Sequence, residues 1–107
     1  MKVLQWSMTI PKKKQGAFLR CSKERFSPTW KKFGCVKYEL LKVENKPIKG
    51  SVLEKDTFFE RVYFEGSFDI PSFFAKVKEN PKAWELSRLY EKKFGAHDIE
   101  LRILAFP

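Results

Sequence analysis

His97 is the only histidine in the chain, and imidazole is the side chain best suited to exchange a proton near neutral pH. It lies just after Gly95, where a helix is expected to end. Its chemistry makes it a candidate general base, or a ligand of haem or a metal ion. The alternative is a polar residue in a helix-to-strand loop. A zinc site needs three or four ligands. With no second histidine and no P-loop, glycine-rich dinucleotide motif or Ser-His-Asp set, we expect no metal and no cofactor.

Aromatic residues form 16% of the chain and supply a second candidate site. Pro28 and Pro81 interrupt two helical patterns and could hold those helices away from a sheet, which would leave room for a small hydrophobic ligand. The alternative is that the same aromatic side chains are ordinary members of the core. The candidate ligand pocket consists of Trp6, Tyr38, Trp30, Phe74 and Trp84.

The charge balance raises the question of a nucleic-acid partner. The chain has 22 Lys and Arg residues against 13 Asp and Glu, a formal net charge of +9, and clustered cations gain affinity for phosphates by releasing counterions. Only five of these cations are Arg, whose planar guanidinium reads phosphates and bases better than Lys does. The Lys-rich and Glu-rich composition also resembles that of thermophilic proteins, in which charge serves stability and solubility.

A length of 107 residues without a linker-like stretch predicts a single domain over residues 1–107. No apolar run approaches the ~20 residues that span a bilayer. The N-terminal stretch alternates too strictly for a signal peptide, so we expect a cytoplasmic protein without a membrane partner. Cys21 and Cys35 have neither the density of a disulfide scaffold nor CxxC spacing, and we expect both to be reduced.

Hydrophobic periodicity predicts the order strand, helix, strand, strand, helix, strand. Amphipathic spacing indicates helices at residues 12–33 and 69–95. Each contains a proline after a helix-capping residue type, at Ser27-Pro28 and Asn80-Pro81. The first helix is therefore expected to kink or restart at Ser27, and the second to be broken midway, so each comes in two pieces. Residues 44–50 are rich in turn formers, and residues 51–57 are either a loop or the start of the next strand. Alternation of apolar and polar side chains indicates strands at residues 3–10, 35–44, 58–65 and 98–106.

The tetrapeptide Lys-Lys-Phe-Gly occurs at residues 31–34 and again at residues 92–95, each time where a helix is expected to pass into a strand. Glycine can take the left-handed conformation that ends a helix, and the lysines would lie near the negative end of the helix dipole. A Glu-Leu pair follows both copies at the same offset. The recurrence therefore marks the two halves of an α+β domain of ferredoxin-like βαββαβ order, with a four-stranded antiparallel sheet and helices on one face.

Alternation divides the strand side chains between an almost wholly apolar face, expected to lie under the helices, and a mixed face. Contiguous apolar patches on monomers are small and tend to mark interfaces. Two copies could pair through the mixed face, because it carries both charge signs and its aromatics could fill the centre. The alternative is a single-stranded nucleic acid stacked on Phe59, Arg61 and Tyr63, as in RNA-recognition motifs. The expected dimer face consists of Glu39, Phe59, Arg61, Tyr63, Arg102, Leu104 and Phe106.

The chain resembles the dimeric α+β barrel superfamily, which includes antibiotic-biosynthesis-monooxygenase-like, EthD-like and NIPSNAP-like families, in its element order and in the stretch YFEGSFDIPSFFAKVKENPKAWELSRLYEKKFG. There a strand leads to an acidic cap, a Phe-containing helix, a mid-helix proline and a second helical piece. The resemblance implies a homodimer whose two sheets face each other, with a ligand pocket between sheet and helices. It implies binding of a small hydrophobic ligand or cofactor-independent oxygenase-like activity, and leaves open whether the chain is an enzyme.

Overall fold

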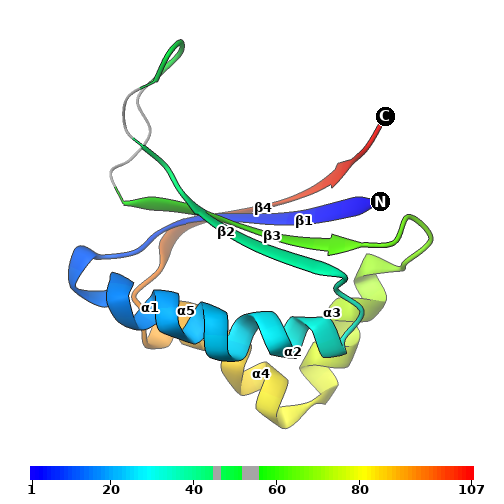
Figure 1. Cartoon of the computed structure of the whole chain (residues 1–107). Helices are drawn as coiled ribbons and strands as arrows, with labels where there is room; N and C mark the ends of the chain where they lie inside the picture. Colours follow the sequence, from blue (N-terminus) through cyan, green and yellow to red (C-terminus); the bar gives the residue numbers. More distant parts are fainter. Residues whose placement is uncertain (45–46, 52–55) are drawn as a thin grey trace.

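The computed structural model describes residues 1–44, 47–51 and 56–107, so the turn expected at residues 44–50 and the loop or strand start expected at residues 51–57 lie partly outside the described residues. Helices cover one face of a four-stranded antiparallel sheet, and the other face is uncovered (Figure 1). This confirms the expected ferredoxin-like βαββαβ arrangement. The strand order is β2-β3-β1-β4, formed by β1 (Lys2–Thr9), β2 (Lys37–Lys42), β3 (Thr57–Phe64) and β4 (His97–Ala105).

The first helical segment keeps helical backbone angles through Ser27-Pro28, where a kink or restart was expected, and the change there is from a π-type turn to α2. It runs through η1 (Lys12–Lys14), α1 (Gln15–Cys21), η2 (Ser22–Phe26) and α2 (Ser27–Lys32) (Figure 1). Ser27 keeps helical angles and its backbone N–H donates to the carbonyl of Ser22, five residues back, which makes η2 a wider π-type turn. The wider turn leaves room for the Pro28 ring, which would clash with the preceding turn of a regular α-helix.

The second helical segment is interrupted at Asn80, as expected. α3 (Ile70–Glu79) ends there, and α4 (Pro81–Ser87) and α5 (Leu89–Lys92) follow. Asn80 is extended, and its Oδ1 accepts a hydrogen bond from the Ala83 N–H at 3.0 Å, which caps α4. At the start of α3, Asp69 lies at the capping position, but its backbone carbonyl accepts from the N–H groups of Ser72 and Phe73. Its carboxylate makes no cap bond.

The two Lys-Lys-Phe-Gly copies end helical segments as predicted. Gly34 has φ of +108° and Gly95 has φ of +66°, both in the left-handed region that favours glycine. A Cβ on Gly34 would lie 2.4 Å from the ring of Phe68. A side chain at this position would therefore clash with that ring. The phenylalanines differ, because Phe94 is fully buried and Phe33 only half-buried.

The core lies between the helices and the sheet and is dominated by phenylalanine. The rings of Phe18 and Phe58 meet edge to face at 5.4 Å between centroids, and those of Phe18 and Phe94 at 5.6 Å. Cys21 and Cys35 are buried free thiols, as expected. None of the helices in the described part of the chain is both long and apolar enough to cross a membrane.

The helices do not cover β4, which corrects the expectation that the whole apolar face is buried. Every residue of β4 is exposed. On the helix-facing side of this strand, Ile99, Leu101 and Ile103 are 38%, 46% and 58% exposed. The reason is its place in the sheet, because β4 is an edge strand bonded only to β1.

Candidate functional site

Glu60 is a carboxylate that is completely buried between the sheet and the helices. It lies in the middle of β3, opposite Trp6 of β1 and Leu40 of β2. Its side chain shares the helix-facing side of β3 with Phe58 and Val62, which are also buried. An isolated carboxylate in such surroundings costs several kcal/mol unless hydrogen bonds satisfy it, so its partners define the site.

Two tyrosines satisfy the Glu60 carboxylate. The hydroxyl of Tyr38, on β2, donates to Oε2 at 2.5 Å. The hydroxyl of Tyr90, on α5, lies 2.8 Å from Oε1 and 2.9 Å from Oε2. The indole Nε1–H of Trp30, on α2, donates to the Tyr90 oxygen at 3.2 Å. We call these four residues the Glu60 cluster; they come from four elements and form one continuous hydrogen-bonded network.

Burial changes the acidity of the Glu60 cluster. Loss of solvent raises the pKa of Glu60 to about 7, and the hydrogen bonds from Tyr38 and Tyr90 act in the opposite direction. Burial, followed by the nearby Glu60 charge, raises the pKa of both tyrosines above their ordinary value. At neutral pH the carboxyl is therefore divided between its two protonation states while both phenols stay protonated. A group poised in this way can accept or release a proton.

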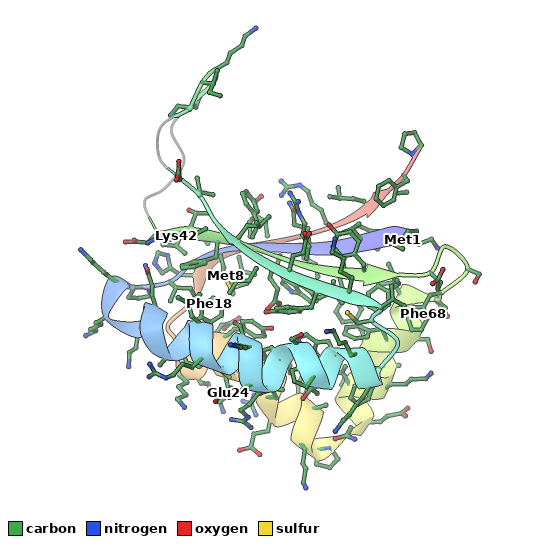
Figure 2. All side chains as sticks on the ribbon, in the orientation of Figure 1. Met1, Met8, Phe18, Glu24, Lys42 and Phe68 are labelled. Atoms are coloured by element: carbon green, nitrogen blue, oxygen red, sulfur yellow. The ribbon has the colours of Figure 1, made fainter. Side chains whose placement is uncertain are left out.

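Aromatic rings surround the Glu60 cluster and keep it apolar. The ring of Phe26 stacks on that of Tyr90 with centroids 4.1 Å apart and an interplanar angle of 9°. Phe26 also lies parallel to Trp30 at 6.1 Å, and Phe18 meets Tyr90 edge to face at 6.2 Å. Figure 2 shows Phe18 pointing from α1 toward the sheet. These contacts fix the positions of the two donors and exclude water from the carboxylate.

The five expected pocket residues fall into three groups. Tyr38 and Trp30 belong to the Glu60 cluster. Trp6 lies opposite Glu60 on the neighbouring strand and meets Phe74 of α3 edge to face at 6.4 Å. Trp84 is 42% exposed on α4 and lines a separate hollow with residues of α4 and α5. The main surface hollows of the described residues do not include the Glu60 cluster. Glu60 itself has no exposed surface.

His97 lies apart from these aromatic residues. It is the first residue of β4, opposite Thr9 of β1, rather than a loop residue. Its side chain is 54% exposed, and Nδ1 lies 2.8 Å from Oδ2 of the neighbouring Asp98. Within the described ranges, no three His, Cys, Asp or Glu side chains are close enough to hold a metal ion. His97 therefore lies beside the exposed carboxylate of Asp98 and outside any enclosed site in the described residues.

Glu60 was absent from the candidates drawn from the sequence. A signal was present, because Glu60 is the one charged residue on a side of β3 that otherwise carries Phe58, Val62 and Phe64. A charge at such a position is informative, since buried polar groups are rarer than exposed apolar ones. Its two tyrosine partners lie 22 and 30 residues away in the chain, so spacing alone does not reveal them.

The uncovered face of the sheet carries the expected dimer face. Glu39 on this face has two partners within the chain: the Tyr63 hydroxyl donates to it, and Lys37 Nζ lies 3.6 Å from it. Arg61 Nε–H donates to Oε1 of Gln5 at 2.9 Å. Near the end of β4, a hollow of about 350 Å³ is lined by Val3, Arg61, Tyr63, Leu104, Ala105, Phe106 and Pro107.

Two more expected members of the dimer face complete this picture. Phe59 is half-buried on β3, and Arg102 on β4 forms an ion pair with Glu100 at 2.7 Å. At the rim, Leu104 is 40% and Phe106 is 63% exposed. The face therefore combines two ion pairs and a hydrogen-bonded Arg61 with exposed apolar side chains.

Comparison with known proteins gives a clear result for the fold. No protein-family model matches the chain, and no curated protein matches it in sequence. A solved structure from Deinococcus radiodurans, provisionally described as an antibiotic biosynthesis monooxygenase, superposes with a TM-score of 0.68 at 9% identity, covering 100% of this chain and 93% of that one.

Two further solved structures are similar. An ethyl tert-butyl ether D (EthD) family protein from Bacillus halodurans gives a TM-score of 0.58 at 14% identity, covering 100% of both chains. A dimeric ferredoxin-like protein from an uncultured marine organism gives 0.62 at 14% identity, covering 99% of this chain and 94% of that one. The resemblance expected from the sequence is confirmed for the fold, and identities this low extend it no further.

Proposed function

We propose that this chain is a homodimeric α+β barrel protein that binds a small hydrophobic ligand beside Glu60, and that Glu60 exchanges a proton with it. The observation that carries the proposal is the Glu60 cluster, a fully buried carboxylate with a pKa of about 7 held by two tyrosines. A carboxyl that serves only the core gains nothing from this arrangement, because an apolar residue of similar size avoids the cost of burial.

The route to Glu60 runs past Tyr38. This tyrosine is half-buried and lies on β2, an edge strand of the sheet, whereas Glu60 itself has no exposed surface. A ligand that displaced the Tyr38 side chain would meet the carboxylate and the stacked rings of Phe26 and Tyr90. Flat aromatic surfaces of this kind favour a planar apolar ligand, and the carboxylate favours one with a hydroxyl group.

The chemistry available to this site is proton abstraction. Ionised Glu60 could take a proton from an acidic hydroxyl or carbon of the ligand, while the neutral hydroxyl of Tyr90 donates a hydrogen bond to the charge that develops. Removal of a proton activates an aromatic ligand toward oxygen. The site therefore supports cofactor-independent oxygenase-like activity, which agrees with what the similarity to a monooxygenase-like protein suggests.

The homodimer would form through the uncovered sheet face. Its rim exposes Leu104 and Phe106, so association would bury apolar surface. Glu39 and Arg102 of this face already form ion pairs within the chain, with Lys37 and Glu100. Two of the similar solved structures are described as dimeric ferredoxin-like proteins. A single-stranded nucleic acid on this face has less support, because Arg61 and Tyr63 already bond to Gln5 and Glu39.

Titration with 2-naphthol, a planar aromatic hydroxyl compound, tests the site. We expect saturable quenching of tryptophan fluorescence, with a Kd on the order of 100 µM. Because ionised Glu60 is the stronger hydrogen-bond acceptor, the affinity should rise roughly tenfold as the pH passes upward through the Glu60 pKa. In Glu60→Gln the affinity should be lower and should not change with pH in this interval.

His97→Gln is the matched control, because it replaces a polar side chain that lies outside the Glu60 cluster and is 54% exposed. This variant should bind 2-naphthol as the unmodified chain does. Circular dichroism checks that each variant is folded, and Tyr38→Phe provides a second, milder change at the site. Absence of saturable binding to the unmodified chain, or an unchanged pH dependence in Glu60→Gln, would contradict the proposal.

A further inference from the structure

The net positive charge of the chain comes from its helical layer, which we define as residues 12–33 and 70–94. This layer contains fourteen Lys and Arg residues and four Glu, a formal charge of +10. The remainder contains eight cations and nine carboxylates, so it is almost neutral. All fourteen cations of the helical layer are exposed. Figure 2 shows nitrogen-tipped side chains projecting from this layer on the side away from the sheet.

These cations have no carboxylate partners within the described residues. The ion pairs found there join Lys37 to Glu39, Lys42 to Asp56, His97 to Asp98 and Arg102 to Glu100, and each lies on the sheet or beside it. The helical layer therefore does not build the ion-pair networks typical of thermophilic surfaces. Unpaired positive charges on one surface create a positive electrostatic potential, and this potential attracts a polyanion.

A hollow between the two helical segments gathers several of these cations. It measures about 360 Å³ and receives Arg25 and Lys32 from the first segment and Lys82 from the second. Asn80, on its wall, uses its Oδ1 to cap α4 and keeps its NH₂ group as a donor. Glu24 is the acidic residue among the lining, and Figure 2 shows it pointing outward from the helical layer. Three cations against one carboxylate leave the hollow positive.

We propose that the helical layer binds the phosphate backbone of double-stranded nucleic acid without sequence preference, centred on this hollow. This inference does not depend on the ligand site of the Glu60 cluster. The layer is rich in Lys, which contacts phosphates as a point charge and reads no bases.

Other polyanions fit the helical layer less well. Single-stranded nucleic acid needs a row of aromatic side chains for base stacking. A membrane surface needs an apolar stripe that inserts among the lipids. The exposed large apolar residues of the helical layer are Leu19, Phe74 and Trp84, on three different helices, and Phe74 packs against Trp6 of the sheet. They form neither a stacking row nor a stripe.

Fluorescence anisotropy with a labelled, mixed-sequence duplex of ~20 base pairs tests this proposal. We expect a Kd on the order of 10 µM at about 50 mM NaCl, with affinity that falls steeply as salt rises. Lys32→Gln combined with Lys82→Gln should weaken binding roughly tenfold and reduce the slope of log affinity against log salt by about 2, because two phosphate contacts are lost.

The matched control is Lys2→Gln combined with Lys49→Gln, which removes the same charge outside the helical layer. It should change the affinity by less than about twofold. Equal losses in the two double variants would overturn the proposal, because binding would then depend on net charge alone. Absence of duplex binding at low salt, or a preference for phosphatidylserine vesicles over the duplex, would also overturn it.

Discussion

At the scale of single residues, burial of Glu60 links stability to pH. Its pKa in the folded chain is about 7 and its ordinary value is 4.5, so the folded state holds the proton more tightly than the unfolded state. The stabilisation is therefore complete below about pH 4.5 and is lost as the pH rises through 7. The free energy of unfolding should fall by about 3 kcal/mol over this interval from this group alone.

Glu60→Gln removes the titrating group, and urea unfolding at a series of pH values measures the effect. The variant should lose most of the decline in stability between pH 4.5 and 7 that the unmodified chain shows. Tyr38→Phe provides an independent comparison. It removes a hydrogen bond that lowers the Glu60 pKa, so the decline should extend to higher pH. An identical pH profile for Glu60→Gln and the unmodified chain would show that Glu60 is not the group concerned.

The sequence was less informative about residues than about elements. Tyr38 and Trp30 were among the expected pocket residues, but the carboxylate that joins them through Tyr90 was not. Their connection depends on the pairing of β2 with β3 and on the position of α5, neither of which any local pattern specifies. His97 was a candidate because of its residue type, and residue type alone does not predict whether a side chain is buried.

At the scale of elements, the junction after α2 depends on a glycine. Gly34 has a positive φ, and a Cβ there would lie 2.4 Å from the Phe68 ring. Gly50 has a similar φ of +100° but no atom within 4 Å of such a Cβ, so it is a matched control for backbone strain alone. Gly34→Ala should cost at least about 2 kcal/mol of stability, and Gly50→Ala roughly 1 kcal/mol.

Urea denaturation of the two glycine variants measures this difference. Equal losses would mean that the Phe68 contact has no role and that backbone conformation accounts for both effects. The comparison also separates two uses of glycine that sequence alone does not distinguish. The Lys-Lys-Phe-Gly repeat predicted where both helical segments end, whereas the packing of Phe68 on Gly34 is visible only in the folded chain.

Element boundaries were predicted well where the chemistry is local. Asn80-Pro81 ends α3 and caps α4, as the residue types indicate. Ser27-Pro28 has the same form but lies inside a continuous helical segment, because the π-type turn of η2 accommodates the proline ring. Burial of Phe26 and Trp30 on either side keeps that segment against the core, and packing of this kind overrides a local signal.

At the scale of the whole molecule, the sheet separates two roles. The helix-facing side of β3 carries Glu60, and its opposite side carries Arg61 and Tyr63 of the expected dimer face. Adjacent residues of one strand would thus serve the ligand site and self-association. The order of elements and the alternation of apolar and polar side chains predicted which side of the sheet faces the helices. The exposure of β4 was not predicted, because strand order in a sheet is set by tertiary pairing.

Use of both sides of the sheet requires a homodimer, and light scattering coupled to size exclusion tests this most directly. At micromolar concentration the mass should be about twice 12.7 kDa. Leu104→Asp places a charge in the proposed interface and should give a monomer, whereas Leu19→Asp, at a leucine of similar exposure on α1, should leave the dimer intact. A monomeric mass for the unmodified chain, or dissociation by Leu19→Asp but not by Leu104→Asp, would contradict the claim.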